Sequence, residues 1–181
     1  IEKYSSQESN EKILNPVWHV HNGSPPSEKI VMPFSMLLNI VGSSNAKSKD
    51  VLWKFIKKFH KEINPQNHKI LDELTKYAIN YFEDEVEPKK KFKKPNKTEK
   101  KALENLILQL NKVSQNTPAE EIQTMIYSVG KENGYKENLR DWFKLIYQVT
   151  FGEENGPRMG FFISFFGVKE TIDLMEKKLN I

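Results

Sequence analysis

Two arginines are the residues of this chain whose chemistry points most clearly to a ligand. Arg140 and Arg158 are the sole arginines among 28 Lys and Arg residues. A guanidinium offers a planar fork of donors, whereas an ammonium is a point charge. Arg140 lies one helical turn before Lys144 and two residues before Trp142. Arg158 stands at the expected start of a helix, where backbone N–H groups attract anions. For both, an ion pair with a carboxylate on a neighbouring helix is the structural alternative.

A cluster of lysines is the second feature with possible chemistry. Residues 89–101 contain eight lysines and one acidic residue, Glu99, with Phe92 among them. Its densest part comprises Lys89, Lys90, Lys91, Lys93 and Lys94. A flexible basic loop beside an aromatic suits phosphate contact and stacking on a single-stranded base. The alternative is a solvated loop, because lysine, asparagine and isoleucine are plentiful throughout, as AT-rich coding favours.

Motifs for catalysis and metal binding are missing. The chain has no phosphate-binding loop, no GxGxxG or GxSxG motif, and no cysteine. His19 and His21 lie on a segment expected to be extended, with no HExxH motif beside them. The acidic residues of 83–87 fall on different helix faces, which favours a solvated helix end over a cation site. We therefore predict no catalytic residue, no metal site and no cofactor in this chain.

Composition predicts one globular domain with a very polar surface. The 181 residues carry a net charge of +4, with 38% hydrophobic, 29% charged and 11% aromatic residues. The longest apolar run, 159–168, is far shorter than the ~20 residues that span a bilayer. The chain begins at Ile1 with no Met and no signal-peptide pattern, so we expect a piece of a longer protein. The absence of cysteine fits a reducing cytoplasm.

Apolar residues recur at helical spacing through most of the chain, which predicts an all-α bundle or cage of about eight helices. Gly42 is expected to end the first helix, and Ser48, Thr98 and Thr117 to cap later ones. Two helices are apolar nearly all round and should be central: 33–41 and 157–166. The eight expected helices are 33–41, 48–59, 70–86, 98–113, 118–129, 139–151, 157–166 and 168–179. Residues 1–30 lack a period and are expected to be a linker or irregular lead-in, and 31–181 the helical domain.

An ordered set of motifs resembles the carboxy-terminal part of class I lysyl-tRNA synthetase. The resemblance runs from about residue 14 to residue 178. It rests on Pro33-Phe34-Ser35-Met36-Leu37-Leu38-Asn39, Ser44-Asn45-Ala46 with Trp53 and Ile56, Glu120-Glu121-Ile122-Gln123 with Tyr127, Asp141-Trp142-Phe143 with Ile146-Tyr147, and the run from Phe151 to Gly160. The stretch from Pro16 to Pro26 also resembles the segment that precedes this part in bacterial members.

The resemblance implies a cage-like, all-helical anticodon-binding domain similar to that of bacterial glutamyl-tRNA synthetase. The full enzyme would join lysine to tRNA with ATP, through an aminoacyl-adenylate, on an amino-terminal Rossmann-type catalytic domain. Neither a HIGH-type nor a KMSKS-type signature occurs in this chain, so we expect it to be inactive alone and ATP to bind elsewhere in the enzyme. The implied partners are lysine tRNA and the enzyme's own catalytic domain, with no membrane and no DNA, in the cytoplasm.

The residues themselves suggest how such a domain would recognise RNA. Lysine tRNAs carry uridine-rich anticodons, and a single-stranded loop can splay its bases onto aromatic or guanidinium planes. We predict that Arg140, Trp142, Lys144 and Arg158 line the reading surface, with the lysines of 89–97 at its rim. The competing hypothesis is a helical adaptor whose lysine loop contacts an acidic protein.

Overall fold

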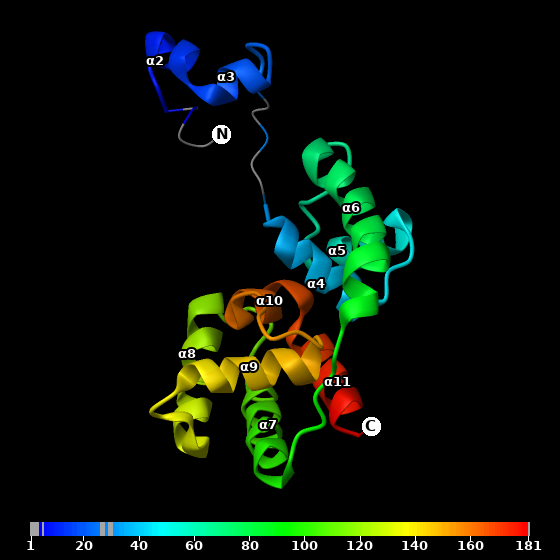
Figure 1. Ribbon diagram of the computed structural model, residues 1–181, viewed down its shortest axis with the longest axis vertical. Helices are drawn as coiled ribbons and strands as arrows, with labels where there is room; N and C mark the ends of the chain where they lie inside the picture. The colour runs from blue at the N-terminus through cyan, green and yellow to red at the C-terminus, as the bar shows by residue number, and fades with distance from the viewer. Residues whose placement is uncertain (1–3, 5, 26–27, 29–30, 181) are drawn as a thin grey trace.

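The computed structural model describes residues 4, 6–25, 28 and 31–180, and in this part of the chain every regular element is a helix (Figure 1). The all-α prediction is therefore confirmed, and α4–α11 correspond to the eight expected helices. The helices are α2 (Ser9–Leu14), α3 (Pro16–Val20), α4 (Phe34–Ser44), α5 (Lys49–Phe59), α6 (Lys69–Tyr81), α7 (Lys97–Leu110), α8 (Ala119–Gly130), α9 (Leu139–Thr150), α10 (Met159–Phe166) and α11 (Val168–Leu179). A turn of π-helix (Phe82–Val86) follows α6, and a kinked segment (Lys131–Tyr135), in which Asn133 and Gly134 have non-helical backbone angles, follows α8.

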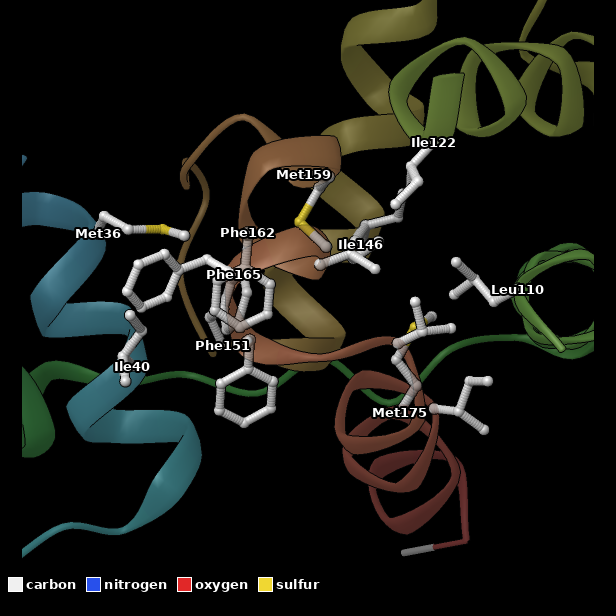
Figure 2. Close-up of a cluster of buried hydrophobic side chains, with 14 of the residues drawn as sticks. Met36, Ile40, Leu110, Ile122, Ile146, Phe151, Met159, Phe162, Phe165 and Met175 are labelled. Atoms are coloured by element: carbon white, nitrogen blue, oxygen red, sulfur yellow. The ribbon is translucent and has the colours of Figure 1, made fainter. Parts of the chain in front are cut away.

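Helix α10 lies at the centre of the hydrophobic core. Phe162 and Ile163 are completely buried, and the Phe151 ring meets the Phe162 ring edge-on at 4.9 Å between centroids. Figure 2 shows Met36 and Ile40 of α4 on one side of these rings, and side chains of α8, α9 and α11 on the other. The prediction that 33–41 and 157–166 form the centre is confirmed.

The most extensive contact between two of the described helices, that of α8 with α10, depends on Gly160. A Cβ at this position would lie 2.2 Å from the Ala119 carbonyl oxygen, so a larger residue would push the helices apart. The Gly160 N–H donates to Oε1 of the buried Gln123 at 2.8 Å. Because the loop of residues 152–158 runs from α9 into the start of α10, this contact also holds the end of that loop that joins α10.

Several predicted helix ends are wrong for physical reasons. Gly42 lies inside α4, because the Phe82 ring packs onto it: a Cβ there would lie 2.6 Å from that ring. Ser48 caps α5 as predicted. Asn96 rather than Thr98 caps α7, in a reciprocal capping box with Glu99. Thr117 does not cap α8, whose N-cap residue is Pro118.

The expectation of an irregular lead-in over 1–30 is corrected in part, because α2 and α3 lie within it. Neither helix contains a buried residue. His19 lies in the last turn of α3 and His21 is its C-cap residue, so this segment is not extended. Glu28 contacts the helical domain: its carboxylate accepts the Ile70 N–H at 3.0 Å and the Leu71 N–H at 3.4 Å, at the start of α6. Among the described helices, none has the length and apolar character needed to cross a membrane.

Candidate nucleic-acid interface

Helix α9 presents a polar and aromatic stripe on one face. Arg140, Phe143, Lys144 and Tyr147 are spaced three and four residues apart, so their side chains share that face. The loop of residues 152–158, between α9 and α10, passes over the stripe. Together they form what we call the α9 pocket, lined by Asn138, Arg140, Asp141, Phe143, Lys144, Tyr147, Glu154 and Asn155.

Tyr147 fixes the loop to the helix. Its hydroxyl donates to the Pro157 carbonyl oxygen at 2.9 Å. A Cβ on Gly156 would lie 2.5 Å from the Tyr147 ring, so the backbone can approach the ring only with glycine at this position. Burial raises the pKa of Tyr147 to about 12, so the hydroxyl keeps its proton well above neutral pH. The pocket therefore has a rigid aromatic wall.

A second aromatic pair extends this wall toward α8. The Phe143 ring contacts the Tyr127 ring edge-on at 5.1 Å and the Tyr147 ring at 6.2 Å between centroids. Tyr127 is exposed, and Phe143 is partly exposed. Exposed aromatic faces next to cations are the surface on which single-stranded bases stack.

The cations of the pocket differ in their partners. Lys144 Nζ lies 2.8 Å from Glu154 Oε1, and this ammonium lowers the pKa of the Glu154 carboxyl. Arg140 is exposed and has no hydrogen bond or ion pair with any residue that the structure describes. Asn138 donates its amide N–H to Asp141 Oδ2 at 2.7 Å. The guanidinium is thus available to a ligand, whereas the lysine is occupied by a carboxylate.

Arg158 lies at the other end of the 152–158 loop, as the N-cap residue of α10. Its Nη1 is 3.8 Å from Glu120 Oε1, and 63% of its side chain is exposed. An exposed pair at this distance holds a guanidinium weakly. Arg158 therefore does form an ion pair with a neighbouring helix, but most of its guanidinium N–H donors remain accessible.

Trp142 does not line this surface, and its predicted role in RNA contact is wrong. It is completely buried, and its indole N–H donates to the Ile126 carbonyl oxygen at 3.0 Å. Residues two apart on an α-helix point about 200° apart, so Trp142 faces the core while Arg140 faces outward. The spacing of apolar residues that predicts this helix also places Trp142 on its buried face.

The lysine segment, which we define as residues 89–97, is less free than a flexible loop. Figure 1 shows it passing α11 on its way from the end of α6 to the start of α7. The Lys91 N–H donates to the Gly152 carbonyl oxygen at 2.9 Å, and the Lys93 N–H to the Gln148 carbonyl oxygen at 3.1 Å. The segment is therefore attached to the end of α9, next to the loop that covers the pocket.

Its lysines are not equally available for binding. Lys89 pairs with Glu85 at 2.5 Å and Lys93 with Glu99 at 2.6 Å. The Lys90 side chain is only 10% exposed, lies 4.8 Å from the Phe82 ring centroid, and has its pKa lowered by burial. The ammonium groups of Lys91 and Lys94 are exposed and have no acidic partner among the described residues.

Phe92 is also engaged within the protein. Lys178 Nζ of α11 lies 3.6 Å from the centroid of the Phe92 ring, a cation–π contact. The ring also covers the backbone of Gly152. Nearby, the acidic residues of 83–87 behave as a solvated helix end: Glu83 and Glu87 pair with Lys47. Within the described residues, no three His, Asp or Glu side chains form a metal-binding group.

The sequence interpretation missed the aromatic and amide side chains of the pocket. Phe143 and Tyr147 fall within the helix expected over 139–151, and their positions three and seven residues after Arg140 put them on the same face as that residue. Asn138 and Asn155 carry no signal of their own, because only the fold of the 152–158 loop brings residues so far apart in sequence together.

Comparisons with known proteins find lysine–tRNA ligases of similar sequence. The chain is 38% identical over 179 residues to the lysine–tRNA ligase of Roseobacter denitrificans, covering 99% of this chain and 34% of that protein. It is 39% identical over 180 residues to the lysine–tRNA ligases of Rickettsia felis and Rickettsia bellii, covering 98% of this chain and 34% of each. The chain thus spans about a third of the length of these curated relatives. No solved structure matched significantly.

A protein-family model described as an anticodon binding domain matches residues 35–179, which takes in α4–α11 almost completely. The matched region contains the α9 pocket and the lysine segment, and it excludes α2 and α3. The chain belongs to the anticodon-binding domain family.

Proposed function

We propose that this chain binds the anticodon loop of lysine tRNA, with the α9 pocket reading bases and the lysine segment contacting phosphates. One observation carries the proposal: the pocket combines partly exposed aromatic rings, an unpaired guanidinium and side-chain amides within one hollow. A base needs a surface for stacking and donors or acceptors for its edge, and this hollow offers both.

Each group has a distinct part in this proposal. The rings of Phe143 and Tyr147 offer a face for a splayed base. Arg140 supplies paired donors, which suit the carbonyl oxygens of uracil, and Asn155 can both donate and accept. Arg158 extends the surface beyond the loop, while Lys91 and Lys94 contact the backbone phosphates.

The full-length protein, in the same proposal, is a class I lysine–tRNA ligase that attaches lysine to its tRNA during protein synthesis in the cytoplasm. The support is the family resemblance of the motifs together with the lysine–tRNA ligases to which the chain is similar. Lysine activation with ATP would belong to the catalytic domain, which is the second partner of this chain. The chain alone is expected to bind tRNA without charging it.

The test is binding of the isolated chain to lysine tRNA and to the same tRNA with the middle anticodon base changed, across a salt series. We expect weaker binding after the base change, because a lost base contact costs about 1–3 kcal/mol, or about 5- to 150-fold in affinity. Each single-stranded phosphate contact should add about −0.7 to the log–log salt slope.

The adaptor hypothesis predicts a different result in the same experiment. A helical adaptor for an acidic protein would bind both tRNAs and an unrelated polyanion such as heparin alike, or would bind none of them. Equal affinities at every salt concentration would therefore contradict the proposed function.

A further inference from the structure

The two lead-in helices, α2 and α3, present apolar side chains to solvent. Ile13 and Leu14, at the end of α2, are 52% and 83% exposed, and Val20, at the end of α3, is 76% exposed. Figure 1 shows the two helices together at one end of the molecule, apart from α4–α11. A single exposed apolar residue is ordinary, but Leu14 and Val20 are the two most exposed large apolar side chains among the described residues. This part of the chain therefore has an apolar surface that a partner could bury.

Local contacts order this segment without covering its apolar side chains. The Asn15 side chain accepts the Val17 N–H at 3.0 Å, which caps α3, and donates to Gln7 Oε1 at 2.6 Å. Gly23 has a φ of +79°, and a Cβ there would lie 2.9 Å from the Trp18 ring, so the turn after α3 folds back onto that ring. Helices of six and five residues are nevertheless marginal in water unless other parts of a protein pack against them.

The charge of the segment favours a protein partner over RNA. Residues 1–30 contain four glutamates and three lysines, whereas the rest of the chain carries the excess of lysine and arginine. A surface that binds phosphates needs a surplus of cations. An apolar and nearly neutral surface instead fits the apolar surface of another protein domain.

The comparisons indicate which protein that domain belongs to. The anticodon-binding model begins at residue 35, after α2 and α3. The similarity to lysine–tRNA ligases covers 98–99% of this chain and therefore includes both helices. The chain nevertheless spans only 34% of each of those ligases. The lead-in is thus shared with much longer ligases, although it lies outside the region that the anticodon-binding model matches.

We propose that α2 and α3 dock onto the catalytic part of the full-length ligase through Ile13, Leu14 and Val20. This inference rests on the proposed function, in which the full-length protein is a lysine–tRNA ligase. Glu28 connects the docking segment to the helical domain, because its carboxylate accepts two backbone N–H groups at the start of α6. The segment thereby links the catalytic part to the domain that reads the anticodon.

The test uses the absence of cysteine from this chain, which makes a single introduced thiol a report on its own position. Leu14→Cys and Val20→Cys test the docking segment, and Leu108→Cys, at a 59% exposed leucine of α7, is the control. The rate of labelling by a maleimide is measured at each thiol in the isolated chain and in the full-length ligase, and mass spectrometry identifies the labelled peptide. Dividing each rate by that of the same protein unfolded in urea removes differences in intrinsic reactivity.

We expect the thiols of Leu14→Cys and Val20→Cys to react at least about tenfold more slowly in the full-length ligase, because a docked segment must open before a buried thiol reacts. The thiol of Leu108→Cys should change its rate by less than about twofold, because it lies outside the docking segment. Circular dichroism of each variant establishes that it is folded.

Three results would overturn the docking. These are equal rates in the isolated chain and the full-length ligase, equal protection of all three positions, and slow labelling of Leu14→Cys and Val20→Cys already in the isolated chain. In the last case, light scattering distinguishes burial against a second copy from burial within one chain.

Failure of the docking is distinguishable from failure of the proposed function. The preference of the isolated chain for lysine tRNA over the tRNA with a changed anticodon tests the proposed function without the catalytic part. If that preference is present and the thiols are not protected, the docking is wrong and the proposed function stands. If the preference is absent, the proposed function is wrong, and the labelling rates still decide whether α2 and α3 are covered in the full-length protein.

Discussion

The α9 pocket and the lysine segment differ in how many of their cations are free to bind a ligand. The segment has the densest positive charge in the chain, yet Lys89, Lys90 and Lys93 each lie near a carboxylate of this protein. The pocket contains only two cations, and one of them, Arg140, has no partner among the described residues. A count of charges therefore overstates the capacity of the segment to bind RNA and understates that of the pocket.

The largest expected effect comes from disturbing the packing that supports the α9 pocket. Trp142→Ala should lower the free energy of unfolding by about 3–5 kcal/mol, since it leaves a large cavity in the core. It also removes the indole N–H that the Ile126 carbonyl oxygen accepts. Urea unfolding measures this loss of stability, and the control is Arg140→Ala, which changes a residue on the outward face of the same helix. Arg140→Ala should change stability by less than about 0.5 kcal/mol.

Equal losses of stability in these two variants would contradict the assignment of α9 to a buried face and a reading face. The result would mean that the arginine also supports the fold.

A smaller effect separates the lysines from one another. The double variant Lys91→Ala/Lys94→Ala removes two unpaired ammonium groups and should reduce the log–log salt slope of RNA binding by about 1.4. Lys89→Ala/Lys93→Ala removes the same net charge from lysines that already pair with Glu85 and Glu99, so its slope should fall by less than half of that amount. Equal slopes in the two double variants would show that these ion pairs do not limit RNA binding.

The smallest effect concerns the hydroxyl that fixes the 152–158 loop. The pKa of Tyr147 is raised from its ordinary value of 10.0 to about 12. Between these pH values the unfolded chain releases this proton while the folded chain keeps it, so the folded state binds more protons and loses stability as pH rises.

We therefore expect the free energy of unfolding to fall more steeply above pH 10 in wild type than in Tyr147→Phe. Urea unfolding from pH 8 to about 11 checks this, with ionisations common to both proteins cancelling in the comparison. Parallel curves would mean that the Tyr147 hydroxyl titrates as it does in the unfolded chain.

The sequence predicted most of the fold because helix formation is largely a local matter. Apolar residues at three-and-four spacing identified α4–α11, including the buried α10. The errors lie where distant contacts overrule local signals. Gly42 continues α4 because Phe82 packs onto it, and Glu28 satisfies the first N–H groups of α6 from 42 and 43 residues away.

The candidate site was harder to predict for the same reason. Residue type and helical spacing predict Arg140 and Lys144, whereas Trp142 is near them only in sequence, because its helical phase places it in the core. The pairing of Lys90 with Glu153, and the approach of Gly156 to Tyr147, depend on the tertiary fold and leave no local pattern.

The central claim is that the α9 pocket reads bases while the lysine segment supplies charge. Its most direct test measures the ratio of affinities for lysine tRNA and for the same tRNA with its middle anticodon base changed. The proteins compared are wild type, Arg140→Ala and Lys91→Ala/Lys94→Ala. Lys69→Ala, at an exposed lysine on the first turn of α6, serves as the control for charge loss.

We predict that Arg140→Ala abolishes the preference for the lysine anticodon, while the double lysine variant weakens binding to both RNAs and keeps the preference. Lys69→Ala should leave the preference unchanged. Loss of the preference in the double lysine variant, or its survival in Arg140→Ala, would contradict the claim.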